Sequence, residues 1–208
     1  MFYDLIARAP ERISFLNDYY KRRGAKIKRD YCLFLHKMGL LKPLSFVMWL
    51  ATYKCNCTCP FCEASAGKAL PNELTTAEAK ALIDDLAKMK VKRFLISGGE
   101  PLERPDIIEI MEYTNKRKID LGLVSNGYRV EELWDDLSRF NFSIFFTSID
   151  GLEQYHDQMR GRASAFKRAM RSLELFDQKK VKTRMINTVV HPGNINQMES
   201  LLKIVKSF

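Results

Sequence analysis

Short runs of β-branched and aromatic residues alternate with amphipathic stretches along most of this 208-residue chain. The predicted strands cover residues 46–52, 93–97, 120–124, 142–147 and 183–190. Helices are predicted over about 76–90, from 105, around 131–137, over 163–178 and from 195. A strand–helix repeat of roughly thirty to forty residues favours parallel βαβ units with right-handed crossovers. The alternation therefore predicts an α/β fold.

The number of predicted strands limits the architecture. Five strands fit an open or partial parallel (β/α) barrel, because a closed eight-fold barrel needs about 250 residues. The first run, 46–52, is continuously apolar and is therefore expected to be a buried strand. The helix from residue 76 should begin at a capping box, Thr75-Thr-Ala-Glu78. We expect this α/β domain to occupy residues 45–208.

The segment before the first strand differs in composition. Residues 1–45 carry ten Lys or Arg against four Asp or Glu, within a chain of net charge +9. We expect residues 1–44 to form a basic helical segment. Its charge is compatible with an acidic peptide, a nucleic acid or a membrane surface as partner, and also with a solvated helical face. Charge alone does not choose among these.

Four of the five cysteines fall within Cys55-Asn-Cys-Thr-Cys-Pro-Phe-Cys62. The spacing of Cys55, Cys59 and Cys62 is Cys-x3-Cys-x2-Cys, and three such thiolates can bind three irons of a [4Fe–4S] cluster and leave the fourth iron open. Cys57 does not fit this spacing and is interpreted as a loop or packing residue. The alternative is a structural zinc site, which usually needs a second Cys-x2-Cys pair. Reduced thiols that bind a metal are expected in the cytoplasm.

Further polar motifs follow the next predicted strands. They are Gly98-Gly-Glu-Pro101 after the second strand, Ser125-Asn-Gly127 after the third and Ser148-Ile-Asp150 after the fourth. The carboxyl ends of parallel strands meet at one edge of a sheet, where α/β proteins bind their ligands. Two adjacent glycines would let the backbone approach a ligand closely. The sequence therefore predicts one site at this edge, with the cysteines as part of it.

Over residues 45–208 these motifs resemble those of the radical S-adenosylmethionine (SAM) enzymes, whose fold is a partial barrel. The resemblance implies that Cys55, Cys59 and Cys62 ligate the cluster and that SAM completes the coordination of the fourth iron. It further implies that SAM is cleaved reductively and that the resulting radical abstracts hydrogen from a substrate. The cofactor-binding residues that it implies are Phe61, Gly98, Gly99, Glu100, Pro101, Asn126, Ser148 and Arg160.

The resemblance also implies a role for each of these residues. The motif at 98–101 receives the amino group of SAM, and Phe61 packs near the adenine. Asn126 and Ser148 contact the ribose hydroxyls or the carboxylate. Arg160 pairs with the carboxylate, for which a guanidinium fork is well suited.

Residues 62–76 resemble the subgroup that carries cysteine-rich C-terminal SPASM or twitch domains. Those enzymes modify ribosomal peptides or help to build cofactors such as tetrapyrroles. A peptide or small-molecule substrate is therefore expected, with an electron donor such as a flavodoxin or ferredoxin. The sequence shows neither a sixth strand nor a second cysteine group, so we expect further protein, as a C-terminal domain or a partner chain.

Two other functions stay open on the sequence. One is a radical SAM enzyme that acts on RNA or on a lipid, which the basic segment would favour. The other, from a different class, is a zinc-dependent nucleic-acid-binding module. The sequence contains no run of eighteen apolar residues, so no transmembrane segment is predicted.

Overall fold

The computed structural model describes residues 31, 34–35, 38 and 45–206. The chain divides into two units, Met1–Pro43 and Leu44–Phe208. The helical segment predicted for residues 1–44 lies almost entirely outside the described residues. In the described part, no helix has both the length and the hydropathy that a membrane span requires.

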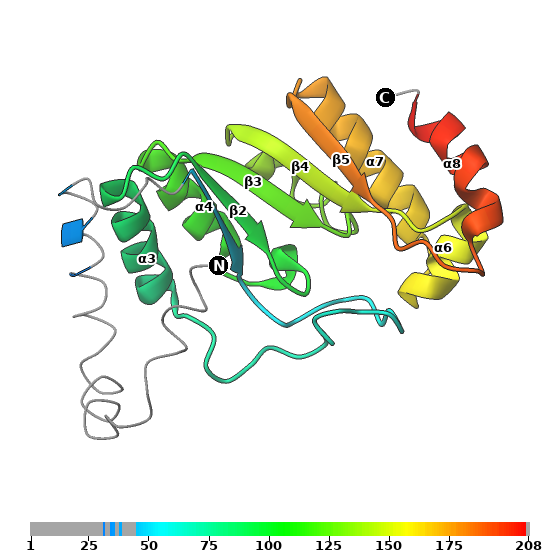
Figure 1. Cartoon of the computed structure of the whole chain (residues 1–208), viewed down its shortest axis with the longest axis horizontal. Helices are drawn as coiled ribbons and strands as arrows, with labels where there is room; N and C mark the ends of the chain where they lie inside the picture. Colours follow the sequence, from blue (N-terminus) through cyan, green and yellow to red (C-terminus); the bar gives the residue numbers. More distant parts are fainter. Residues whose placement is uncertain (1–30, 32–33, 36–37, 39–44, 207–208) are drawn as a thin grey trace. The chain divides into compact units, whose positions relative to one another are not determined.

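The second unit is built on a five-stranded parallel sheet (Figure 1). Its strands are β1 Phe46–Leu50, β2 Arg93–Ser97, β3 Asp120–Ser125, β4 Phe142–Ser148 and β5 Thr183–Asn187. They lie side by side in sequence order, and each pair is parallel. The predicted α/β class and partial parallel barrel are confirmed.

Helices connect the strands and follow the last one. They are α3 Thr76–Lys88, α4 Ile107–Lys116, α5 Trp134–Leu137, α6 Glu153–Arg160, α7 Ala165–Gln178 and α8 Met198–Val205, with short 3-10 turns at Pro101–Glu103 and Ile195–Gln197. The predicted capping box is present at the start of α3, where Thr75 and Glu78 bond each other's backbone N–H groups. The helices differ from the prediction at two places. Helix α5 has only four residues, and α6 was not predicted at all. Helix α6 is strongly polar and buries a single residue, His156, so it lacks an apolar stripe.

The strand predicted at 46–52 is present over Phe46–Leu50, but the prediction that it is buried was wrong. Strand β1 ends at Leu50 and lies at an edge of the described sheet. Its side chains alternate: Val47 and Trp49 pack against the core, whereas Phe46, Met48 and Leu50 are 45%, 55% and 46% exposed. A continuous apolar run is typical of a buried strand, but an edge strand can bury one face and leave the other open.

Strand β5 is also shorter than predicted. It ends at Asn187, whose carbonyl accepts a bond from Ile149 N–H. Beyond it the chain is held through side chains: Thr188 Oγ1 donates to Ile149 O, and Val189 N–H donates to Asp150 Oδ1. The apolar run therefore continues past the point where the ladder of hydrogen bonds stops.

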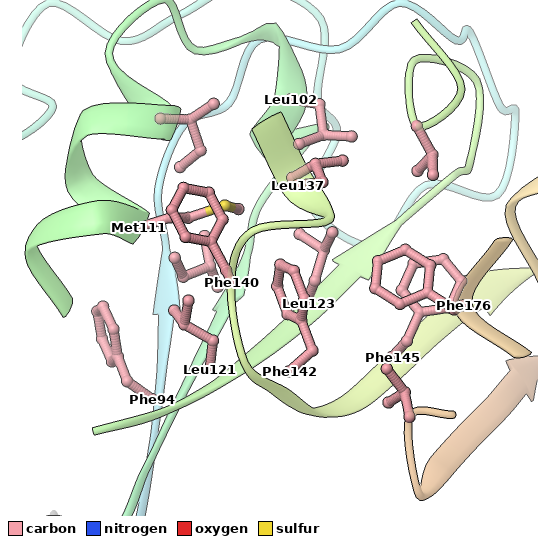
Figure 2. Close-up of a cluster of buried hydrophobic side chains, with 14 of the residues drawn as sticks. Phe94, Leu102, Met111, Leu121, Leu123, Leu137, Phe140, Phe142, Phe145 and Phe176 are labelled. Carbon is pink, nitrogen blue, oxygen red and sulfur yellow. The ribbon is translucent and has the colours of Figure 1, made fainter. Parts of the chain in front are cut away.

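The core lies where the sheet meets the helices (Figure 2). Phe94, Leu121 and Phe145 point into it from three strands, and Met111 enters from α4. The rings of Phe145 and Phe176, the latter from α7, are stacked with centroids 3.8 Å apart. This packing holds the strands, and so fixes the carboxyl edge where the predicted site residues lie.

Candidate active site at the carboxyl edge of the sheet

Two loops meet at the carboxyl ends of the strands. The cysteine loop, residues 51–75, follows β1, and the glycine loop, residues 98–101, follows β2. Glu100 N–H donates to Lys54 O at 2.8 Å, which joins the two loops through their backbones. In Figure 1 the cysteine loop, in cyan and teal, runs past the ends of the strands. The structure thus brings the predicted cluster ligands next to the Gly-Gly-Glu-Pro motif.

The two glycines pack against the backbone of the cysteine loop. Gly99 N–H donates to Thr52 O at 2.7 Å. Gly98 has a φ of +144°, and a Cβ atom there would overlap Thr52 O. A Cβ atom on Gly99 would lie 2.6 Å from Lys54 O and 2.8 Å from Tyr53 O. The need for glycine therefore arises from contact between two segments of this chain, in addition to any approach of a ligand.

The three predicted ligands are half-buried, and each sulfur accepts a hydrogen bond from an N–H group. The donors are Cys57 N to Cys55 Sγ at 3.4 Å, Arg160 Nη1 to Cys59 Sγ at 3.6 Å and Ala66 N to Cys62 Sγ at 3.4 Å. Hydrogen bonds to the cysteine sulfurs are among the features that tune iron–sulfur clusters.

Cys57 differs from its neighbours in burial. It is only 3% exposed, and Asn126 Nδ2 donates to its sulfur at 3.4 Å. The hydrogen bond between the side chains of Cys57 and Cys55, together with burial, raises the pKa of Cys57 above the ordinary thiol range. The same hydrogen bond lowers the pKa of Cys55 to about 6. This placement supports the interpretation of Cys57 as a packing residue.

Glu100 is fully buried, and its carboxylate is used inside the protein. Ser125 Oγ and Leu102 N–H donate to Oε1 at 2.9 and 3.1 Å, and Asn126 N–H donates to Oε2 at 2.7 Å. Burial raises the pKa of Glu100 to about 7, against the effect of these donors. The side chain therefore connects the glycine loop to the turn after β3.

The other predicted cofactor-binding residues lie along the same edge. Asn126 follows β3, and its Nδ2 donates to Asn56 Oδ1 in the cysteine loop at 2.7 Å. Ser148 is half-buried at the end of β4, in register with Asn187 of β5. Pro101 is buried and opens the short 3-10 turn after β2.

Arg160 ends α6 and lies between a buried carboxylate and the cysteine loop. Its Nη2 atom is 2.6 Å from Asp150 Oδ2, and its guanidinium lies 5.5 Å from the centroid of the Phe61 ring. Asp150 and His156 are each only 1% exposed, and Asp150 N–H donates to His156 Nδ1. Neither of these two was predicted as a site residue. The Ser148-Ile-Asp150 motif was a signal for Asp150, whereas His156 depends on α6.

The donor set fits an iron–sulfur cluster in its chemistry. In the described part of the chain, no group of three or more His, Cys, Asp or Glu side chains is arranged to hold a metal ion. The cysteine loop nevertheless presents three half-buried thiols in eight residues, and each has an N–H donor. Cys55, Cys59 and Cys62 would hold the cluster.

Comparison with known proteins gives a consistent result. The family model described as the radical SAM superfamily matches residues 49–205. The mycofactocin maturase MftC of Mycolicibacterium smegmatis is 31% identical over 172 residues, which are 82% of this chain and 43% of that protein. The AdoMet-dependent heme synthase of Methanosarcina barkeri is 32% identical over 163 residues, 77% of this chain and 46% of that protein. The chain thus spans less than half the length of these relatives.

A solved structure shows the same fold. Streptococcus suis SuiB bound to its precursor peptide SuiA matches 88% of this chain and 41% of its own, with a TM-score of 0.67 at 18% identity. The family match covers the cysteine loop, the glycine loop and all five strands except the start of β1. The chain therefore belongs to the radical SAM superfamily, whose enzymes use a [4Fe–4S] cluster and S-adenosylmethionine.

Proposed function

We propose that this chain holds a [4Fe–4S] cluster through Cys55, Cys59 and Cys62, binds SAM beside it, and acts in peptide modification or in the biosynthesis of a cofactor. The observation that carries the proposal is the junction of the two loops. Glu100 N–H bonds to Lys54 O, one residue before the first predicted ligand. A cluster and the SAM amino group would thus be bound by segments that already contact each other. Bound together, and given one electron by a donor such as a flavodoxin or ferredoxin, the two cofactors would supply hydrogen-abstracting chemistry.

The proposed SAM contacts extend along the edge of the sheet. The glycine loop offers backbone carbonyls to the amino group, and Phe61 offers an aromatic face to the adenine. Asn126 and Ser148 offer polar side chains to the ribose or carboxylate. Arg160 Nε is buried and has no hydrogen-bond partner among the described residues, which leaves a donor for the carboxylate.

The relatives support both proposed substrate classes. One is named a mycofactocin maturase, one a heme synthase, and SuiB was solved with a precursor peptide. On this chain, the exposed side chains of Phe46, Met48 and Leu50 offer an apolar surface along β1, the strand that leads into the cysteine loop. Such a surface suits an apolar segment of a peptide or the face of a macrocycle. Membership of the superfamily leaves no role for the zinc-dependent nucleic-acid-binding module.

Cysteine substitutions test the ligand assignment. We expect Cys55→Ala, Cys59→Ala and Cys62→Ala each to abolish cluster assembly and the formation of 5′-deoxyadenosine from SAM, because three ligands are needed to hold the cube. Iron content after anaerobic reconstitution and 5′-deoxyadenosine formed with dithionite are the measurements. Cys57→Ala is the matched control, in the same loop, and should retain both. A Cys59→Ala protein that still binds about four irons would contradict the assignment.

A further inference from the structure

The guanidinium of Arg160 is held from three directions. Its Nη2 atom pairs with Asp150 at 2.6 Å, its Nη1 atom donates to Cys59 Sγ at 3.6 Å, and its plane lies by the ring of Phe61. The Arg160 side chain is only 11% exposed, so little water competes for these contacts. The guanidinium of an arginine has two terminal nitrogens, so it can contact a carboxylate and a sulfur at the same time. The single ammonium of a lysine is less suited to this.

Asp150 is a rigid support for this guanidinium. Its Oδ1 atom accepts a bond from Val189 N–H, and its backbone carbonyl accepts one from Asn194 Nδ2. Its own N–H donates to His156 Nδ1. With its backbone and one carboxylate oxygen bonded in this way, the other oxygen stays directed at Arg160. A buried carboxylate also makes the loss of its cation costly.

The backbone at the end of α6 is fixed to the cysteine loop independently of the Arg160 side chain. Thr58 N–H donates to Arg160 O at 2.9 Å. Gly161 has a φ of +60°, and a Cβ atom there would overlap Thr58 Oγ1. Both contacts keep this end of the helix close to Cys59. Replacing the Arg160 side chain should therefore leave the two segments together.

We propose that Asp150 and Arg160 set the reduction potential of the cluster: Asp150 positions Arg160, and Arg160 stabilises the sulfur of Cys59. The inference rests on the proposed cluster site and is separate from any contact of Arg160 with SAM. A cation that donates a hydrogen bond to a cysteine sulfur favours the more negative, reduced state of a cluster. Asp150 acts only through Arg160 and is a positioning residue.

The test is a redox titration of the reconstituted protein, followed by electron paramagnetic resonance and carried out without SAM. We expect Arg160→Gln to lower the equilibrium constant for one-electron reduction about tenfold, a fall of about 59 mV in midpoint potential. Arg162→Gln is the matched control. Arg162 carries the same charge two residues away, but its Nη1 atom donates to Asn56 O and its guanidinium lies over Tyr128. The control should shift by less than a third as much.

Two further variants keep the result interpretable. Arg160→Lys keeps the charge but not the fork, and should fall by at least half as much as Arg160→Gln. The Asp150→Asn/Arg160→Gln protein avoids a buried carboxylate without its cation, and its potential should still fall, but by less than in Arg160→Gln because a negative charge is removed as well. An unchanged potential in this double variant, or a wild-type potential in Arg160→Lys, would overturn the inference. Failure of the wild-type protein to assemble a cluster would instead overturn the proposed function.

Discussion

At the scale of single residues, burial decides the behaviour of Glu100. Desolvation raises its pKa to about 7, although two N–H groups and the Ser125 hydroxyl bond its carboxylate and oppose the rise. The negative charge on Cys55 adds to the rise. A carboxyl with this pKa gains or loses its proton near neutral pH. The connection between the glycine loop and the turn after β3 therefore changes its charge in that range.

The free energy of unfolding of the cluster-free protein should depend on pH because Glu100 titrates in this range. The pKa of Glu100 is about 7 in the folded protein against 4.5 as the reference, so the folded state keeps its proton longer as pH rises. The contribution of Glu100 to stability is therefore lost between pH 4.5 and 7, by about 3 kcal/mol at most. We expect Glu100→Gln to lose correspondingly less over this window in urea unfolding. Cys55 and Arg129, which interact electrostatically with Glu100, are common to both proteins. Equal losses would contradict the assignment.

At the scale of elements, the helices begin in two different ways. Helix α3 is capped locally, since Thr75 and Glu78 bond each other's backbone N–H groups. Helix α7 is capped from a distance: Asp157 of α6 accepts bonds from Ser164 N–H and Phe166 N–H. The side chain of Ser164 makes no capping hydrogen bond in the described structure. The first cap was predictable from four neighbouring residues, and the second required α6 to be in place.

The local cap of α3 gives a test at this scale. Thr75→Ala removes the acceptor for Glu78 N–H, and we expect it to lower the free energy of unfolding by about 1 kcal/mol. Urea unfolding of the cluster-free protein measures this. Ser164→Ala, at the corresponding position of α7, is the control and should change stability little, because its side chain is not the cap. A larger loss in Ser164→Ala than in Thr75→Ala would refute the explanation.

At the scale of the whole molecule, the aromatic cluster around Phe176 connects α7 to the sheet. Phe176 is fully buried, stacks on Phe145, and meets the edges of Trp134 and Phe142. Its contacts come from two elements besides its own helix. Loss of this ring would leave a cavity where several segments meet.

We expect Phe176→Ala to reduce the free energy of unfolding by about 3–5 kcal/mol, through lost burial and the cavity that remains. Met48→Ala, at a large apolar side chain that is 55% exposed on β1, should change it by about 0.5 kcal/mol or less. Unfolding followed by circular dichroism distinguishes the two. Similar losses of stability in the two variants would contradict this prediction. They would mean that protein covers the exposed face of β1 and that the Phe176 cluster contributes less to stability than its burial indicates.

Much of the fold was predictable from local patterns. Strand β2 and the start of α3 agree with prediction because a buried β-rich run and a capping box are each encoded by adjacent residues. Strand β1 was wrong in burial because an apolar run does not show which face a neighbouring element covers. Helix α6 was not predicted because its residues are nearly all polar, and a single buried residue, His156, gives no periodic signal.

The chemistry proposed for the carboxyl edge was predictable from short-range patterns, namely the spacing of Cys55, Cys59 and Cys62 and the motif at 98–101, because neither pattern needs a distant residue to be recognised. The contacts that support these groups depend on the folded arrangement of distant segments. Arg160 reaches Cys59 across 101 residues of sequence, and Asp150 reaches Val189 across 39. Contacts of this length leave no periodicity in the chain, because they exist only once the parallel strands have aligned their carboxyl ends.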